Sequence, residues 1–562
     1  MKLSDFRVKV ILFLIFTIGV GVVIRQTAFI FSYNIHNNYI EKSLEEVTAN
    51  EGFIPDDTAE VLIVYDEENL LYKENAEELM QQIKMDYSVL GAEDYLNPSV
   101  AYPIVLIAVE TFEAVGNSNA LFEYVEQGGQ LFFLKRVDLT AGFFNHYQKL
   151  GITEFTTFTG VQDIKLNKEY LDEFRQREYS GLFFWNSSLI AQLVGNIQVY
   201  ISSTDQTPIL WQRKYGTGDI TYFNGSMLMD RGHHVILLDY LKRKVEPFIY
   251  PVANIKLVTI GEFPAPLYEG EDEMIYETFL RNNGDFYREV WWPDILSFGK
   301  RAELKYSTAT LTSYQTEASP IGLSKEDYIY FAREILNQDG ELGYQELSFI
   351  REGGLHEAFL PRYKYNQFVP LNGIITEEEM AFIDENPSVV PVVSGAYRTG
   401  NIDIYQSSFK ERTSGVIEIP IISRGYVLDD MNRWLMNSGV MLQGIYHHYL
   451  SGNVLGTGDW ENDYDAFTEA HSRISQAYPF LEAMTVASAA DDVLKYYRED
   501  FTLEEENDQW IVTSSHYGDK YFYFYSDKEI VSVTGGKLRR LPIGGYLLEM
   551  DSTVCILEWS KL

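Results

Sequence analysis

The sequence contains few cysteines and few cationic residues. Only one of its 562 residues is a cysteine, Cys555, so no internal disulfide can form. Cys555 lies in the apolar run 553–557, a setting typical of a small buried core residue. The chain must therefore be stabilised by packed cores and, where it has them, by metal sites rather than by covalent cross-links.

Basic residues are outnumbered by acidic ones. Lys and Arg total 45 against 82 Asp and Glu, which gives a net charge of −37. Phosphate binding needs clustered Lys and Arg, so this charge argues against a nucleic-acid partner. It suits a cationic polymer such as a partly de-N-acetylated amino-sugar chain, or it serves only to keep the protein soluble. The aromatic fraction of 15% fits either stacking on sugar rings or a high content of strands.

Long apolar runs are also scarce, and the one long enough to cross a bilayer lies at residues 8–24. Lys2, Arg7 and Lys9 lie at its start, and acidic residues follow from Glu41, so the positive-inside rule places the N-terminus in the cytoplasm and the bulk outside. No small-x-small cleavage site follows the run, which indicates an uncleaved anchor. We therefore expect a single-pass cell-membrane protein. An extracytoplasmic chain without disulfides points to a Gram-positive envelope.

A chain of this length exceeds one hydrophobic core, and about three domains are expected. The predicted division is a cytoplasmic tip and transmembrane anchor (1–33), a linker (34–57), a first soluble domain (58–250), a second (252–500) and a β-rich C-terminal region (501–562).

In the first soluble domain, apolar strands alternate with helical patterns. Strands are expected at 59–65, 103–108 and 128–134, and helices at 75–83 and 120–127. This alternation predicts βαβ units with a parallel sheet.

The order of these elements resembles class I glutamine amidotransferase-like flavodoxin folds, in which a helix runs into Gly-Gly, here Gly128-Gly129, and then an aliphatic strand. Residues 215–222 look like that fold's late hairpin. The chemistry of that family needs a nucleophilic cysteine, and this chain has none before Cys555. The resemblance therefore implies a flavodoxin-like domain that binds, positions or packs against its neighbour rather than a glutaminase.

The second soluble domain begins with a β-branched run at 255–260 that stops at Gly261-Glu262 and enters a Pro-rich loop. Strands of an α/β barrel are buried on both faces and carry reactive groups at their carboxyl ends. This stretch resembles the first motif of the polysaccharide deacetylase (NodB-like) superfamily, and within it a membrane-anchored bacterial group associated with Pel-type exopolysaccharide. The resemblance implies a distorted β/α barrel over 252–500, with Gly261 at the position of the catalytic base and Glu262 at that of a metal ligand.

The resemblance also locates the other site positions. Its His-x-x-x-His metal motif matches His356 and Leu360, so the second imidazole is missing and Glu262 and His356 remain, where a catalytic zinc has three protein ligands. Arg398 matches the arginine that orients the base, and His447 the histidine that acts as general acid or orients the substrate. Each has a structural alternative: His356 in a surface loop, Arg398 in a salt bridge, and His447 packed and hydrogen-bonded.

Two further patterns complete the second half of the chain. Trp291, Trp292 and Asp294 end an apolar segment and are candidates for a sugar subsite, although paired tryptophans occur equally in cores. A helical pair is expected over 466–498, broken at Tyr478-Pro479. Short strands with Gly-Gly or Asp-Lys turns then predict the β-rich region.

Three functions compete. Gly261 offers no base and the metal set is incomplete, so we expect a degenerate deacetylase-like protein of exopolysaccharide, biofilm or cell-envelope biosynthesis. It would bind an amino-sugar polysaccharide, or components of an exopolysaccharide synthase, without turnover and without a cofactor. If active, it would be a carbohydrate de-N-acetylase with a divalent metal such as zinc on Glu262, His356 and a third ligand. The remaining enzyme reading is a glycoside hydrolase that uses Glu262 and Glu357 as acid and base.

Overall fold

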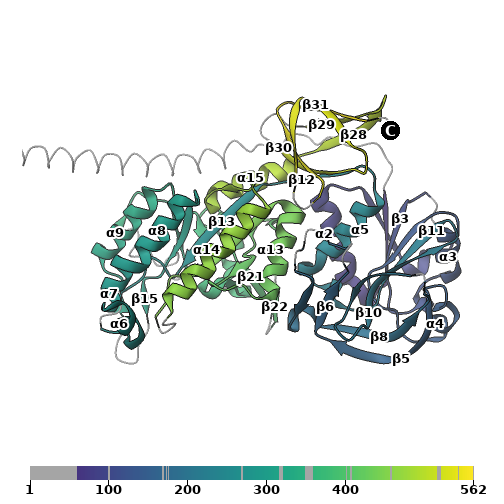
Figure 1. Ribbon diagram of the computed structural model, residues 1–562, viewed down its shortest axis with the longest axis horizontal. Coiled ribbons are helices and arrows are strands. Elements are labelled where there is room, and N and C mark those ends of the chain that lie inside the picture. Colours follow the sequence, from purple (N-terminus) through teal and green to yellow (C-terminus); the bar gives the residue numbers. More distant parts are fainter. Residues whose placement is uncertain are drawn as a thin grey trace, which may run out of the picture.

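The computed structural model of this protein describes most of the chain after residue 59. The described residues are 60–98, 101–167, 170–171, 174, 176–195, 197–267, 270–314, 321–347, 359–399, 402–404, 408–455, 459–515, 520–541 and 544–560. Among them, no helix combines the length and the apolar character that spanning a membrane requires. The predicted anchor and linker lie outside the described residues. The fold is mixed α/β, with two large sheets that contain parallel strands and a β-rich part at the C-terminus (Figure 1).

The first part is built on a nine-stranded sheet of order β2-β1-β3-β4-β11-β10-β9-β6-β7. In this order, each strand from β2 to β11 is parallel to the next. From β11 to β7, each strand is antiparallel to the next. Their bounds are β1 Val61–Tyr65, β2 Tyr87–Gly91, β3 Ile104–Ala108, β4 Gln130–Phe133, β6 Asp163–Leu166, β7 Glu178–Ser180, β9 Gln198–Ser202, β10 Pro208–Tyr215 and β11 Gly218–Phe223. The three predicted strands are confirmed as β1, β3 and β4, and the predicted hairpin is the β10–β11 turn.

The parallel strands read as continuous apolar runs because both faces of the sheet are covered. Val61 and Ile63 of β1 enter one hydrophobic core, whereas Leu62 and Val64 enter another. The covering helices are α2 Leu70–Ile83, α3 Ser118–Glu126, α4 Ala141–His146 and α5 His234–Lys244. The sequence did not indicate the long antiparallel pair of β5 (Ile152–Val161) and β8 (Asn186–Leu193).

The second part contains a curved half-barrel sheet of order β23-β24-β20-β18-β17-β14-β13-β26-β25, in which only β23 is antiparallel to its neighbour. The bounds are β13 Ile255–Gly261, β14 Tyr306–Thr310, β17 Glu341–Tyr344, β18 Gln367–Phe368, β20 Val392–Ser394, β23 Lys410–Glu411, β24 Ile417–Ile419, β25 Ser423–Arg424 and β26 Ile445–Ser451. Residues 420–422 alone join β24 to β25, so the two ends of the sheet approach each other.

Helices line the outside of the half-barrel (Figure 1). They are α6 Glu273–Phe279, α7 Asn283–Phe286, the π-helical turn η7 Tyr287–Trp291, α8 Trp292–Arg301, α9 Lys325–Leu336, α12 Glu377–Glu385, α13 Asp430–Gln443, α14 Trp460–Ala477 and α15 Val486–Arg498. The predicted helical pair with a break at Tyr478-Pro479 is confirmed as α14 and α15. A small separate sheet consists of β19 (Ile374–Ile375), β21 (Ala396–Thr399) and β22 (Ile402–Ile404).

The C-terminal part is β-rich, as predicted, and consists of two four-stranded sheets of order β12-β30-β33-β32 and β28-β29-β34-β31. Their strands are β12 Phe248–Val252, β28 Phe501–Glu506, β29 Gln509–Ser514, β30 Lys520–Tyr525, β31 Ile530–Thr534, β32 Gly536–Arg540, β33 Tyr546–Met550 and β34 Val554–Trp559. The connection between the first two parts, β12, thus completes a sheet of the third. Cys555 is fully buried between the sheets, as expected.

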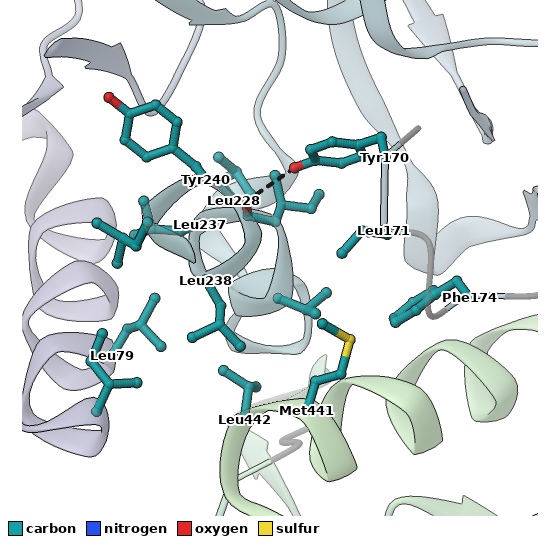
Figure 2. Close-up of a cluster of buried hydrophobic side chains, with 14 of the residues drawn as sticks. Leu79, Tyr170, Leu171, Phe174, Leu228, Leu237, Leu238, Tyr240, Met441 and Leu442 are labelled. Atoms are coloured by element: carbon teal, nitrogen blue, oxygen red, sulfur yellow. Dashed lines mark hydrogen bonds between the residues drawn. The ribbon is translucent and has the colours of Figure 1, made fainter. Parts of the chain in front are cut away.

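Helix α13 ties the half-barrel to the first part of the chain. Met441 and Leu442 pack into the same apolar cluster as Leu79 of α2 and Leu238 of α5 (Figure 2). The buried Trp434 indole donates a hydrogen bond of 2.9 Å to the carbonyl of Gly232. The two parts therefore share one continuous core.

Candidate functional site

The carboxyl ends of neighbouring half-barrel strands gather four polar side chains, here called the mouth cluster: Glu262, Gln345, Tyr449 and Ser451. Strand β13 ends at Gly261, as predicted, and pairs in parallel with β26 so that Gly261 lies opposite Ser451. Gln345 follows β17 directly. Since parallel strands present their carboxyl ends at one edge of a sheet, residues far apart in the chain meet there.

Glu262 is held by contacts on both its backbone and its side chain. Its φ of 54° lies in the left-handed region, and its N–H donates to Oε1 of Gln345 at 2.5 Å. Its carboxylate accepts a hydrogen bond of 3.0 Å from the Ser451 hydroxyl. Burial raises the pKa of Glu262, and hydrogen bonds from Ser451 and Asn453 oppose that rise. The carboxylate is thus oriented, partly desolvated and ready to accept further hydrogen bonds.

The side chain of Tyr449 occupies the space next to Gly261. A Cβ atom built on Gly261 would lie 1.8 Å from the Tyr449 hydroxyl, far inside any contact distance. The ring packs in a buried cluster with Ala309, Val369 and Ile421. Burial first, and then the Glu262 carboxylate, raise the pKa of Tyr449, so the phenol stays protonated at neutral pH. The position predicted for a catalytic base is therefore filled by a neutral hydroxyl from another strand.

The structure decides between the two interpretations of His447. The residue lies in the middle of β26 and is fully buried. Its Nδ1 lies 3.1 Å from the carbonyl oxygen of Pro420, which can only accept, so Nδ1–H donates there. Nε2 then accepts from the Thr259 hydroxyl at 2.7 Å. Burial lowers the pKa of His447 to about 3, so it is a neutral, hydrogen-bonded core residue rather than a general acid.

The predicted tryptophan subsite is corrected in the same way. Trp291 and Trp292 are both fully buried in the half-barrel core, which leaves no ring face for a sugar. The Trp291 indole donates to the Tyr426 hydroxyl at 3.3 Å. Asp294 accepts a hydrogen bond of 2.9 Å from the Trp460 indole, so its carboxylate holds α8 to α14.

The remaining predicted positions are only partly described. Leu360 is buried in the half-barrel core, consistent with its reading as a position without a ligand. Arg398 lies in β21, just beyond β20, and its backbone pairs with Asp403; its side chain is outside what is described. His356 and Glu357 lie outside the described residues.

The described residues do not fit a three-ligand zinc site. Within the ranges given above, no three His, Cys, Asp or Glu side chains gather closely enough to hold a metal ion. Glu262 is the predicted ligand that is described, and its carboxylate contacts Ser451.

Sequence reasoning missed Gln345, Tyr449 and Ser451. Ser451 ends β26, the strand that carries His447, and a single serine at a strand end is no local signal of a site. Tyr449 gave no signal, because its contact with Gly261 depends on the register between β13 and β26. A further carboxylate, Glu346, lies two residues beyond the end of β17. Burial raises the pKa of Glu346, and its carboxylate accepts a hydrogen bond of 3.2 Å from the Thr312 hydroxyl.

The fold and the mouth cluster define a multidomain α/β protein with a half-barrel whose carboxyl edge is polar. A family described as an uncharacterised protein conserved in bacteria (DUF2194) matches residues 180–347 and 354–547, well over half of the chain. The chain belongs to this family. No protein with a curated description matches the sequence.

Several solved structures show limited likeness. An exo-β-1,4-mannosidase, Op5Man5, from Opitutaceae bacterium strain TAV5 is 16% identical with a TM-score of 0.25, over 34% of this chain and 36% of that chain. A β-galactosidase from Bacillus circulans sp. alkalophilus is 14% identical with a TM-score of 0.25, over 34% of each chain. The cytoplasmic protein STM1381 from Salmonella typhimurium LT2 is 13% identical with a TM-score of 0.27, over 33% of this chain and 98% of that chain. The chain thus spans about a third of the length of the two glycosidases.

Proposed function

We propose that this chain is a membrane-anchored, extracytoplasmic polysaccharide deacetylase-like protein whose half-barrel binds an amino-sugar polymer without hydrolysing it. The observation that carries the proposal is at position 261, where the superfamily has its base. Gly261 has no side chain, and the Tyr449 hydroxyl occupies the adjacent space. Deacetylation needs a base that activates water, and a protonated phenol held by burial does not supply one.

We extend this proposal to the fold of the two large parts and to the cellular setting of the protein. The first part would be an amidotransferase-like flavodoxin fold, the second a deacetylase-like distorted β/α barrel, and the whole would act in the exopolysaccharide machinery of a Gram-positive envelope. The parallel strands β1 to β4 and the parallel half-barrel sheet around β13 support this proposal. The apolar run at residues 8–24 would supply the anchor.

The mouth cluster supports binding because it offers both donors and acceptors. Glu262 and Ser451 are half-buried and can contact a ligand: the carboxylate can accept from a sugar hydroxyl or an ammonium group, and the Ser451 hydroxyl can donate or accept. Gln345 and Tyr449 are buried, at 2% and 4% exposed, and hold this pair in place from below. A partly de-N-acetylated polymer is cationic, and the net charge of −37 would attract it. The partly buried Glu262 would then be the anchoring group.

Two enzymatic alternatives remain distinct from this proposal. An active de-N-acetylase would need zinc or a similar ion on Glu262, His356 and a third ligand. A glycoside hydrolase would need two carboxylates either about 5 or about 6.5–9.5 Å apart. The raised pKa values of Glu262 and Glu346 make that pair the one to test, beside Glu262 and Glu357.

Binding calorimetry with partly de-N-acetylated amino-sugar oligomers tests the proposal on the full-length protein in detergent. Glu262→Gln should weaken binding by about tenfold, since a hydrogen bond to a charged group is worth roughly 1.5–3 kcal/mol. Glu504→Gln, at an exposed position of β28, is the matched control and should leave affinity unchanged. Failure of the wild-type protein to bind, or equal affinity of Glu262→Gln, would contradict the proposal.

A further inference from the structure

The first part of the protein contains an open cleft that the half-barrel site does not involve. It lies at the carboxyl edge of the parallel strands, between the segment that follows β3 and the helix that follows β4, and its volume is about 590 Å³. Its polar lining includes Glu113, Ser118, Asn119, Asn145, His146 and Lys149. The carboxyl edge of parallel strands is the usual place for ligands in open α/β sheets.

Ser118 and His146 form a hydrogen-bonded pair in this cleft, called here the α3–α4 cleft. The Ser118 hydroxyl lies 3.0 Å from Nε2 of His146. Ser118 is the first residue of α3 and is partly exposed, whereas His146 ends α4 and is 5% exposed. The imidazole packs against the rings of Phe112 and Phe122, at centroid distances of 4.9 and 4.8 Å. A serine that solvent can reach is thus held against a histidine whose ring is fixed.

Burial and the nearby charges together favour a neutral imidazole at His146. Burial lowers the pKa of His146, Lys149 lowers it further, and Glu113 acts in the opposite direction. Nδ1 of His146 is buried and, within the described residues, has no hydrogen-bond partner. Neutral imidazole is the form that can take a proton from a hydroxyl.

The start of α3 supplies groups that can stabilise negative charge. The first N–H groups of a helix have no intrahelical acceptor. The side chain of Asn117, the N-cap residue, makes no capping hydrogen bond to them. The Lys149 ammonium, 4.5 Å from the centre of the Phe122 ring, adds a positive charge to the lining. The Ala120 N–H donates to the Asn117 carbonyl at 3.1 Å, so the remaining N–H groups of the first turn and the Lys149 ammonium are the candidates for stabilising an oxyanion beside Ser118.

We propose that the α3–α4 cleft is a hydrolytic site for carboxylic esters, with Ser118 as nucleophile and His146 as general base. Ser118 Oγ adds to the ester carbonyl carbon and its proton passes to His146 Nε2. The resulting oxyanion collapses, the bond to the alkoxy oxygen breaks, and His146 returns the proton to the leaving alcohol. Water then adds to the acyl carbon of the acyl-serine while His146 Nε2 takes one of its protons. The bond to Ser118 Oγ breaks, His146 returns that proton to Oγ, and a carboxylic acid leaves.

The open shape and the charged groups define the substrate class. A cleft of about 590 Å³ that opens to solvent admits an acyl group carried by a larger molecule. Its lining holds one carboxylate, Glu113, and one ammonium, Lys149, which suits an ester with polar groups near the acyl carbon. The established cysteine-dependent chemistry of amidotransferases plays no part in this assignment, because the nucleophile is an oxygen.

Hydrolysis of 4-nitrophenyl acetate and covalent labelling with a fluorophosphonate test the proposal on the full-length protein. We expect peptide mapping to place the label on Ser118. Ser118→Ala and His146→Gln should each lower the hydrolysis rate by about 10²-fold or more. Ser472→Ala, at an exposed helical serine, should change neither readout. A label elsewhere, no hydrolysis, or hydrolysis unaffected by Ser118→Ala would overturn the proposal.

A second variant keeps the test valid if Ser118→Ala misfolds. In Ser118→Cys the introduced thiol should react with iodoacetamide at neutral pH at least about tenfold faster than in the double variant Ser118→Cys/His146→Gln, because His146 would take the thiol proton. The other cysteine contributes little background, since Cys555 is fully buried and burial raises the pKa of its thiol to about 11. Equal rates in the two variants would show that His146 does not act as a base.

Discussion

The mouth cluster of the half-barrel and the α3–α4 cleft use their polar groups in different ways. At the mouth, the Tyr449 hydroxyl fills the space beside Gly261, and the Glu262 carboxylate is engaged by Ser451. In the cleft, the Ser118–His146 pair lines an open volume. In the first region, the position predicted for a catalytic base has no side chain of its own, and a buried hydroxyl fills the space beside it. The second carries no motif and remains accessible. A sequence pattern thus locates a position in the fold, but the chemistry possible there depends on which side chains lie next to that position.

The largest effect is expected from placing a side chain at Gly261. Gly261→Ala would put a Cβ atom 1.8 Å from the Tyr449 hydroxyl, and we expect a loss of about 3 kcal/mol or more in the free energy of unfolding. Urea unfolding measures it. The matched control is Gly195→Ala, which meets nothing within 4 Å and should change stability by less than about 0.5 kcal/mol. Equal stability of Gly261→Ala and wild type would show that the mouth is not closed by Tyr449.

A second effect is expected from lowering the pH, and it involves the histidines beneath the mouth. Burial lowers the pKa of His447 to about 3 and that of His448 to about 4. Because the unfolded chain takes up these protons near pH 6.5 and the folded chain does not, stability is full above pH 6.5 and falls as the pH drops below it. Each histidine should cost about 1 kcal/mol between pH 6.5 and 5.5.

Urea unfolding at a series of pH values checks this slope. His447→Gln should reduce the dependence of the unfolding free energy on pH by the contribution of one histidine. This change is expected whatever the effect of the substitution on stability at pH 7. A slope that does not change in this variant would mean that His447 is not the buried neutral residue described above.

The smallest effect concerns the hydrogen bond between Ser451 and Glu262. Ser451→Ala removes a donor that opposes the rise in the pKa of Glu262, so that pKa should rise further. Binding of a cationic oligomer, which requires the ionised carboxylate, should weaken as the pH falls, and in Ser451→Ala it should weaken at a higher pH than in the wild type. The pH at which half of the binding affinity is lost should be higher in Ser451→Ala than in the wild type. Calorimetry over a pH range measures this pH, and an unchanged value would remove Ser451 from the mouth cluster.

Much of the fold could be predicted from local patterns. The apolar runs at β1, β3 and β4 are strands because both faces of their sheet are buried, and the Tyr478-Pro479 break between α14 and α15 is a local backbone signal. The pairing of β12 with β30 could not be predicted, because the two strands lie about half the chain apart and the contact is made only in three dimensions.

In the candidate sites, too, local features could be predicted and contacts between distant residues could not. The strand end at Gly261-Glu262 was predicted because it is a change of pattern within a few residues. The contact of Tyr449 with Gly261 depends on the register of two distant strands. The Ser118–His146 pair joins residues 28 positions apart on two different helices. The burial of Trp291 and Trp292 could not be predicted either, because a pair of tryptophans has the same sequence pattern in a core and in a sugar subsite.

Acetate release most directly tests the central proposal, that the half-barrel does not remove acetyl groups from an amino-sugar polymer. The full-length protein is incubated with N-acetylated amino-sugar oligomers, with and without added zinc, cobalt or nickel. We expect no acetate above background in any condition, because Gly261 provides no base and Tyr449 occupies its place. Metal-dependent acetate release by the unmodified protein, abolished by His356→Ala, would contradict the claim and establish the half-barrel as an active deacetylase.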